Sequence, residues 1–299
     1  MVGPIASSPS VDLSALPPPQ IVPPLDYETV LARKLAKLLE LSPEYTALVE
    51  SDPAMKLLQA DSYDEMLLSQ ALNDAARGML LAFAAGPQLD HIAALFGVTR
   101  LEVAPADPQT GAPAVIESDR ALRRRVQLAP HSFSVAGPEL AYVFHARTAH
   151  GDVADASAVS PAPGEVVVTV LSASGTGVPP APVVDAVRAR LNGPVRPLTD
   201  LVTVQPASLV DYAIVAQLRV FAGPDPELIR QTALQSLGAF LTEARRLGRD
   251  VPRSALIAAL HVGNVQRVDL IQPAADIAIS PAQIARATAI DVTVTGSEL

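Results

Sequence analysis

The sequence lacks cysteine and tryptophan, and aromatic residues make up only 4% of its 299 residues. The absence of cysteine excludes disulfides, thiolate nucleophiles, iron–sulfur clusters and cysteine-ligated zinc. Because aromatics are scarce, the cores must be built from Leu, Val, Ile and Ala, and few side chains can stack on bases or sugar rings. With 49% hydrophobic residues, the chain has enough apolar material for two or three packed modules.

Positive charge is also in deficit, since the formal net charge is −9 and the sequence pI is about 5.0. An acidic chain without clustered Lys and Arg is a poor candidate for nucleic acid binding. No apolar run approaches the roughly 20 residues that span a bilayer, so we expect no membrane partner. No basic stretch followed by an apolar one opens the sequence, so we expect no signal peptide and synthesis in a reducing cytoplasm.

The first segment, residues 1–24, is rich in proline and predicts an extended arm. Proline lacks an N–H donor and biases the preceding residue toward extended geometry, which excludes a helix or a central strand. A disordered tail is the alternative interpretation, but the interspersed Ile, Val and Leu favour an arm that lies on a partner or on the chain's own body. The prolines are Pro4, Pro9, Pro17, Pro18, Pro19, Pro23 and Pro24.

Residues 25–103 predict a helical region. Asp26 is placed to cap a first helix, and Ser62 with Glu65 has the spacing of a capping box that opens a second one, which Gly86 would end. A short helix is expected over 89–96. The apolar stripes could form an intramolecular core, but a lone helix after an arm needs something to pack against. We therefore expect a partner interface on both helices, and its candidate residues are Val30, Leu31, Leu35, Leu38, Leu39, Leu68, Leu72 and Met79.

Residues 104–117, with three prolines and a glycine, predict an exposed variable linker. Beyond it the periodicity favours an α+β fold, in which an arm and a helical bundle region precede small α/β sandwich domains joined as beads on linkers. The middle domain, 118–200, has expected helices at 119–129, 138–149 and 179–191, and strands at 153–159, 165–171 and 200–205. The C-terminal domain, 201–299, has expected strands at 210–220, 265–271 and 289–294, and helices at 226–248 and 251–261.

No group of residues in the sequence forms a catalytic, cofactor-binding or metal-binding pattern. His145 and His150 are five residues apart, which on a helix places them about 140° from one another rather than on one metal-binding face. The glycines before Pro179 lack the Lys-Ser/Thr ending of a phosphate loop. Arg123, Arg124 and Arg125 form the one basic cluster and indicate a solvated face or an acidic partner. We expect no cofactor, no metal and no enzymatic activity.

Several longer segments resemble, in the expected order over about residues 10–296, the baseplate assembly protein J family of contractile-tailed phages and phage-tail-like bacteriocins. Residues 42–53 are short for this family, and 104–117 correspond to a variable loop. The segments are DLSALPPP, PLDYETVLA, MKLLQADSYDEMLLSQALNDAARGMLLAFA, LDHIAALFGVTRL, HARTAHGDVADASAVSPAPGEVVVTVLS, VRPLTDLVTVQ, LGRDVPRSALIAALHVGNVQRVDL, PAADIAIS and IDVTVTG.

The resemblance implies a structural baseplate wedge subunit of a virion or tailocin, assembled in the bacterial cytoplasm. By this resemblance two copies would join a smaller wedge partner (the protein I type) in a heterotrimer that rings the central hub, with C-terminal domains forming ring contacts that couple baseplate opening to sheath contraction. The spike, a lysozyme-like wedge protein and the sheath would lie nearby. Two alternatives remain: a subunit of a type VI-like injection machine, and a tail-associated glycan hydrolase.

Overall fold

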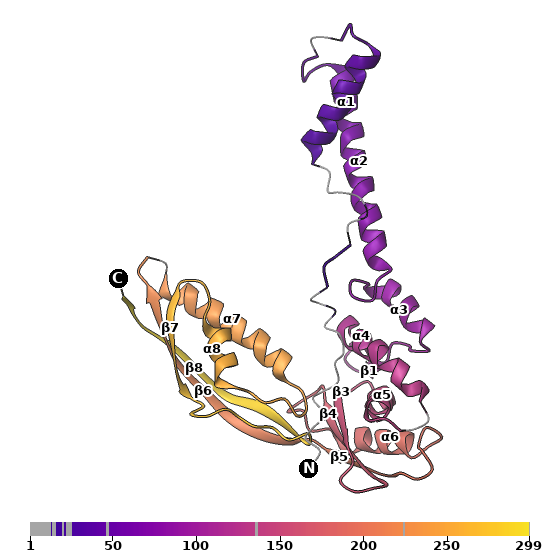
Figure 1. Ribbon diagram of the computed structural model, residues 1–299, viewed down its shortest axis with the longest axis vertical. Coiled ribbons are helices and arrows are strands. Elements are labelled where there is room, and N and C mark those ends of the chain that lie inside the picture. The colour runs from indigo at the N-terminus through magenta and orange to yellow at the C-terminus, as the bar shows by residue number, and fades with distance from the viewer. Residues whose placement is uncertain are drawn as a thin grey trace. The chain divides into compact units, whose positions relative to one another are not determined.

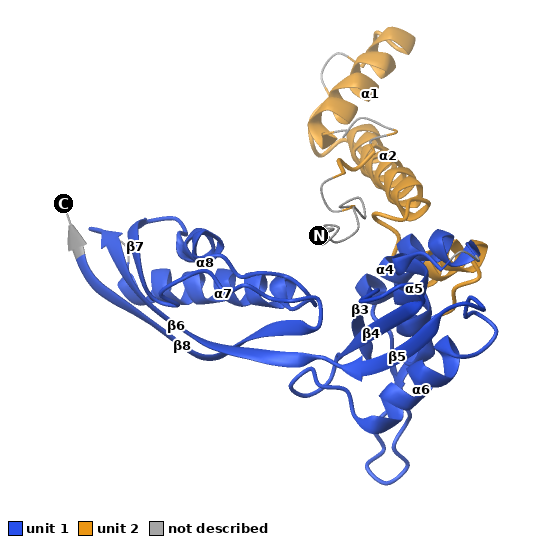
Figure 2. Ribbon diagram, turned by 60° about the horizontal axis from the view of Figure 1, so that its bottom comes forward, with its two compact units in different colours: residues 1–9, 100–299 blue, residues 10–99 orange. Residues whose placement is uncertain are grey.

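The computed structural model describes residues 13, 16–19, 21, 26–45, 48–134, 137–223 and 225–298. The chain divides into two compact units (Figure 2). The helical unit is Ser10–Thr99, and the sheet unit is Met1–Pro9 with Arg100–Leu299. The arm predicted over 1–24 falls mostly outside the described residues, so it stays a prediction.

The described part of the helical unit is built from three helices, α1 (Tyr27–Leu41), α2 (Pro53–Gly78) and α3 (Gly86–Leu95) (Figure 1). Asp26 caps α1 as predicted, because its carboxylate accepts a hydrogen bond from the Thr29 backbone N–H over 3.3 Å. Helices α1 and α2 pack against each other as a hairpin.

The capping box predicted at Ser62 and Glu65 is wrong, because Ser62 lies in the middle of α2. Its hydroxyl donates to the Leu58 carbonyl four residues earlier, over 2.6 Å, which is how serine is accommodated inside a helix. The true start is Pro53, whose ring suits the first helical turn. Helix α2 also ends at Gly78, so Gly86, with a φ of +53°, begins α3 instead of ending α2.

The segment 104–117, predicted to be an exposed linker, closes as a β-hairpin. Strand β1 (Glu102–Ala104) pairs antiparallel with β2 (Val115–Ile116), and an isolated bridge joins Asp107 to Ala112. The Asp107 carboxylate accepts hydrogen bonds from the Gln109 N–H over 2.8 Å and the Thr110 hydroxyl over 2.7 Å. This side-chain turn organises the loop, and the prolines alone did not reveal it.

A buried ion pair fixes this hairpin to α4 (Asp119–Leu128). The Arg125 guanidinium donates to both carboxylate oxygens of Glu117, over 2.8 and 2.6 Å, and the two side chains are only 2% and 6% exposed. Glu117 also accepts from the Leu101 N–H over 3.2 Å. One of the three consecutive arginines is therefore a core residue and does not belong to the solvated face predicted for the cluster.

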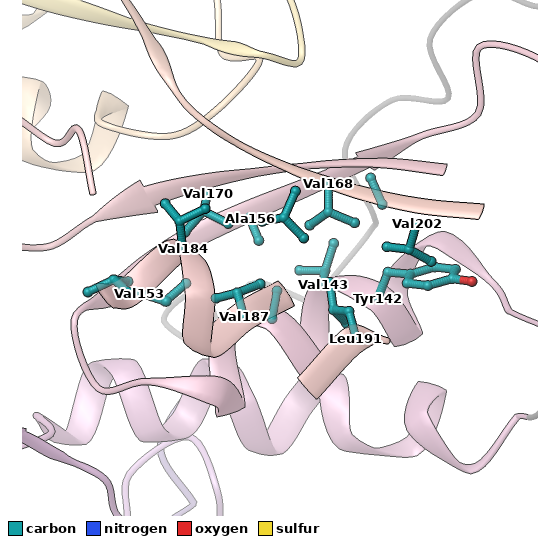
Figure 3. Close-up of a cluster of buried hydrophobic side chains, with 14 residues drawn as sticks. Tyr142, Val143, Val153, Ala156, Val168, Val170, Val184, Val187, Leu191 and Val202 are labelled. Atoms are coloured by element: carbon teal, nitrogen blue, oxygen red, sulfur yellow. The ribbon is translucent and has the colours of Figure 1, made fainter. Parts of the chain in front are cut away.

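The first module of the sheet unit has the strand order β3-β4-β5. A short 3-10 helix, Ala129–Phe133, and α5 (Glu139–Ala149) precede β3 (Val153–Val159), which pairs antiparallel with β4 (Glu165–Ser172). Helix α6 (Ala181–Leu191) crosses over to β5 (Leu201–Pro206), which lies parallel to β4. Valines of the sheet point toward side chains of α5 and α6 and form an aliphatic core with one tyrosine, Tyr142 (Figure 3). The elements predicted here agree with those observed.

The second module has the strand order β7-β6-β8, with α7 and α8 on one face of the sheet (Figure 1). Strand β6 pairs antiparallel with β7 and parallel with β8. The alternating residues of β6, from Ile214 to Val220, turn into the core against the helices. Together the two units make a mixed α+β fold, as predicted. The elements are β6 (Ser208–Phe221), α7 (Pro226–Ala244), α8 (Arg253–Leu260), β7 (Val265–Gln272) and β8 (Gln283–Glu298).

The two sheet modules are joined directly and do not form the expected beads on linkers. Only Ala207 separates β5 from β6, it is buried, and its N–H donates to the Val170 carbonyl over 2.9 Å. Leu171 and Ile284 pack on Ala207 from the two sides of the joint. Both modules consequently share one compact unit.

Polar contacts reinforce this joint. The Asp155 carboxylate of β3 accepts from the Leu247 N–H, just beyond α7, over 3.2 Å, and lies 3.6 Å from the Arg147 guanidinium. Burial raises the pKa of Asp155, while Arg147 opposes that shift. The Ser157 hydroxyl donates to the Pro281 carbonyl over 2.6 Å. A change of angle between the modules would break these contacts and expose the apolar joint.

Replacing Glu117 with alanine should lower the free energy of unfolding by about 3–5 kcal/mol, because the buried Arg125 charge loses its partner. Chemical denaturation followed by circular dichroism measures the loss. The double variant Glu117→Leu with Arg125→Met should lose much less. Asp185→Ala, which removes an exposed pair with Arg188, is the control and should change stability by no more than about 1 kcal/mol. A Glu117→Ala protein as stable as the wild type would contradict this assignment.

Candidate partner interface

Much of the surface of helix α2 is left uncovered by the residues that the structure describes. It has 26 residues, which gives a length of roughly 39 Å, yet its buried residues are only Ser62 and Gly78. Helices in globular proteins gain most of their stability by burying an apolar face. A helix of this length with so little buried surface presents its apolar side chains to solvent or to another chain.

Leu57 and Tyr63 of α2 are exposed, and five further exposed apolar side chains lie close together along the helix. These five, here called the α2 stripe, are Leu67, Leu68, Ala71, Leu72 and Ala75. Their spacing of one, three or four residues places them on one side of the helix. Leu68 is 71% exposed and Leu72 is 51% exposed. Contiguous exposed apolar surface of this kind is typical of protein–protein contacts.

The predicted interface residues of α1 differ in burial from those of α2. Val30 is 1% exposed, whereas Leu31, Leu35 and Leu38 are half-buried. Lys34 lies on the same face of α1 as Val30 and pairs with Asp61 and Glu65, so the Val30 side of α1 is turned toward α2. Val30 is therefore buried by the chain itself. The partner interface predicted at Leu31, Leu35 and Leu38 stays a prediction.

Charged groups hold α1 on α2. The Lys34 ammonium lies 2.6 Å from the Asp61 carboxylate and 3.0 Å from that of Glu65, and Arg33 also pairs with Glu65. The hydrogen bond to Asp61 raises the pKa of Lys34, and the hydrogen bond from Arg33 lowers the pKa of Glu65. Both shifts favour the charged forms of Lys34 and Glu65.

Four of the eight predicted interface residues are exposed: Leu39, Leu68, Leu72 and Met79. Leu68 and Leu72 belong to the α2 stripe, and Met79 follows the end of α2. The sequence interpretation missed Leu67, Ala71 and the connection between α1 and α2, where Leu41, Tyr45 and Val49 are exposed. The adjacent pairs Leu67-Leu68 and Ala71-Leu72 in the sequence indicate a wider apolar stripe. The prediction missed it because it assumed one apolar residue per helical turn.

The described residues offer little for catalysis. Among them, no group of three or more His, Asp or Glu is placed to hold a metal ion. A search of the same residues finds no helix with the length and hydropathy of a membrane span. A cavity of about 440 Å³ beside α7 and β8 is lined by apolar residues together with Thr176, Tyr212, Thr242, Arg245 and Arg286, and no carboxylate or histidine lines it.

Comparisons with known proteins match three segments of the chain. Residues 50–107 match the baseplate J-like N-terminal domain, 134–206 the baseplate J-like central domain, and 212–293 the baseplate J-like protein C-terminal domain. The chain is also 45% identical over 300 residues to baseplate protein J of Escherichia phage P2, covering 97% of this chain and 99% of that protein.

The burial pattern predicts effects of different size for three truncations. Val30→Ala removes buried methyl groups and should lower the free energy of unfolding by about 1–2 kcal/mol. Leu68→Ala and Leu72→Ala truncate exposed side chains and should each change it by less than about 0.5 kcal/mol. Thermal unfolding followed by the helical circular dichroism signal compares them. If Leu72→Ala were as damaging as Val30→Ala, the α2 stripe would have to be buried in the isolated chain.

Proposed function

Because the chain belongs to the baseplate J-like family of phage baseplate structural proteins, we propose that it is a wedge subunit of a contractile tail. In this proposal the helical unit binds other wedge chains through the α2 stripe, and the sheet unit forms contacts around the ring. The single observation that carries the proposal is the exposure of Leu68 and Leu72 on a helix with almost no buried residue.

The proposed wedge contains two copies of the chain and one copy of a smaller wedge protein of the protein I type. A stripe made only of leucine and alanine, without a charged residue inside it, suits helix–helix packing between chains. The hub and spike, the lysozyme-like wedge protein and the sheath are the proposed neighbours, and the wedge is proposed to assemble in the bacterial cytoplasm. A phage tail is favoured over a type VI-like machine because the matched relative is a phage protein.

The joint between the sheet modules bears on the proposed coupling to sheath contraction. Ala207 is buried, and Asp155 and Ser157 bond across the joint. A joint built this way transmits movement, because bending it would expose polar and apolar groups together. We therefore propose that the sheet unit turns as one body during contraction and that the intermolecular contacts change instead.

The assembly prediction uses Leu68→Asp with Leu72→Asp. Charges on the α2 stripe would be trapped at a chain–chain contact, so the variant should fail to form a two-to-one complex when co-expressed with the smaller wedge protein. Native mass spectrometry measures the complex. The control is Leu198→Asp with Leu228→Asp, which places the same charges on two exposed leucines of the sheet unit. Normal complex formation by the Leu68 and Leu72 variant would refute the proposed interface.

We also propose that the chain has no enzymatic activity of its own. The alternative, a glycan hydrolase, needs two carboxyl groups facing each other across a sugar-binding cleft. The cavity beside α7 and β8 has no carboxylate in its lining. Incubation of the purified chain with peptidoglycan should release no soluble fragments above the level of a heat-treated sample, and enzyme-dependent release would contradict this proposal.

A further inference from the structure

The cavity beside α7 and β8, here called the β8 groove, is lined by residues of the sheet unit alone. Strand β8 contributes Ala285, Ala287 and Ile290 to its lining, and Leu241 of α7 and Tyr212 of β6 line it as well. The volume of about 440 Å³ lies in the range of roughly 300–1,000 Å³ found for ligand pockets. The β8 groove is therefore large enough to receive side chains of another molecule.

An exposed isoleucine shows that the groove is not filled by the described side chains. Ile290 is paired in register with Ile214, so the two side chains point to the same face of the sheet. Ile214 is fully buried in the core beneath the helices, whereas Ile290 is 46% exposed. The small side chains of Ala285 and Ala287 on the same strand leave further space. Apolar surface on the helix-covered face of the sheet is thus left open at this point.

The groove runs along an edge of the sheet. Strand β8 is an outer strand in the order β7-β6-β8, and in the described part of the chain no strand pairs with its other side. The Gln283 carbonyl already accepts from the Gly248 N–H over 3.1 Å, and the register with β6 shifts at Thr288. Residues 284–287 lie between these two points in regular register. Backbone groups there that do not bond to β6 point outward and can pair with an added strand.

One positive charge at the groove lacks a counter-charge. Arg245 is exposed, and its guanidinium donates to the Gly175 carbonyl over 3.3 Å, but no described carboxylate lies within ion-pair distance of it. A Cβ at Gly177 would lie 3.2 Å from this guanidinium, so the glycine lets the loop approach Arg245 closely. Arg286, the other arginine of the lining, donates to both carboxylate oxygens of Asp211 over 2.7 and 2.6 Å. Because no carboxylate lines the groove, an anionic group there would be attracted and not repelled.

These features together specify the chemistry of an occupant. Pairing with the edge at 284–287 requires free backbone N–H and C=O groups, which a helix has already bonded within itself. The apolar lining requires a hydrophobic side chain, and Arg245 requires a carboxylate. An extended segment meets all three requirements, because its successive side chains point to opposite sides of its backbone.

We propose that the β8 groove binds a short extended segment of another tail protein, which adds a strand to residues 284–287. An apolar side chain of that segment packs on Ile290 and Leu241, and a carboxylate of the segment pairs with Arg245. Backbone hydrogen bonds at the edge strand supply affinity, and the pocket beside the strand selects the side chain. This proposal rests on the proposed function, because the segment comes from a neighbouring chain of the baseplate.

The probe is a library of random octapeptides, selected by mRNA display for binding to the full chain. Peptides that combine an acidic residue with apolar residues at alternate positions should be enriched. Fluorescence anisotropy then measures the binding of one enriched peptide. N-methylation of alternate residues should weaken its binding roughly tenfold or more in one of the two possible phases only, because one set of its N–H groups faces β8 and the other faces away.

Two substitutions in the groove should remove the binding of the enriched peptide. Arg245→Glu and Ile290→Asp should each weaken it roughly tenfold or more, and a peptide with lysine in place of its acidic residue should bind the Arg245→Glu chain again. The matched controls are Arg188→Glu and Ile271→Asp, which alter an exposed arginine and a 50% exposed isoleucine outside the groove. Both controls should bind the peptide as the wild type does.

Circular dichroism establishes that each variant is folded, and Ile290→Thr replaces Ile290→Asp if that chain unfolds. Selection that enriches no acidic and apolar peptide, or binding that survives the substitutions at Arg245 and Ile290, would overturn the docking. The same holds if the enriched sequence matches a segment of this chain and the chain self-associates in sedimentation velocity, because the occupant is then a second copy. None of these results affects the wedge interface, which Leu68→Asp with Leu72→Asp tests separately.

Discussion

The constraint on which the rest of the structure depends is that apolar surface must be buried, and much of the apolar surface of α2 stays exposed among the described residues. Helix α1 covers one side of α2 through Val30 and the Lys34 ion pairs. Leu68 and Leu72 of α2 remain exposed. Each exposed leucine that becomes fully buried contributes about 1.5–3 kcal/mol. In the proposed function, association with other chains is the stabilising step for the helical unit.

The sheet unit differs, since each of its two modules buries an aliphatic core of its own. Both sheets are covered by their own helices, and Ala207 joins them without a linker. Buried charges are paired, as with Glu117 and Arg125, or bridge the joint, as with Asp155. The sheet unit keeps its internal contacts and can therefore transmit force between partners. In the proposed function, the helical unit buries its exposed apolar surface only in the assembly, and this burial holds the chains together.

The helices and strands of the sheet unit were predicted well because local sequence patterns specify each of them. Strands β3, β4 and β6 follow from an alternating pattern of apolar residues, and the start of α7 follows from a single capping side chain. The helical unit was predicted less well. Ser62 has the spacing of a cap, yet Pro53 starts the helix nine residues earlier. Which apolar side chains of α2 stay exposed depends on where α1 packs. The position of α1 depends on contacts between residues far apart in the sequence, such as the ion pair of Lys34 with Asp61. Local patterns do not contain such contacts.

Amide hydrogen exchange tests the central claim most directly, because it compares the free chain with the chain in assembled tails. The account predicts that the amides of α2 exchange quickly in the free chain and become strongly protected on assembly, since the helix is then packed on its exposed side. Amides in the cores of the two sheets should be protected equally in both states. Equal protection of α2 in the free and the assembled chain would contradict the account.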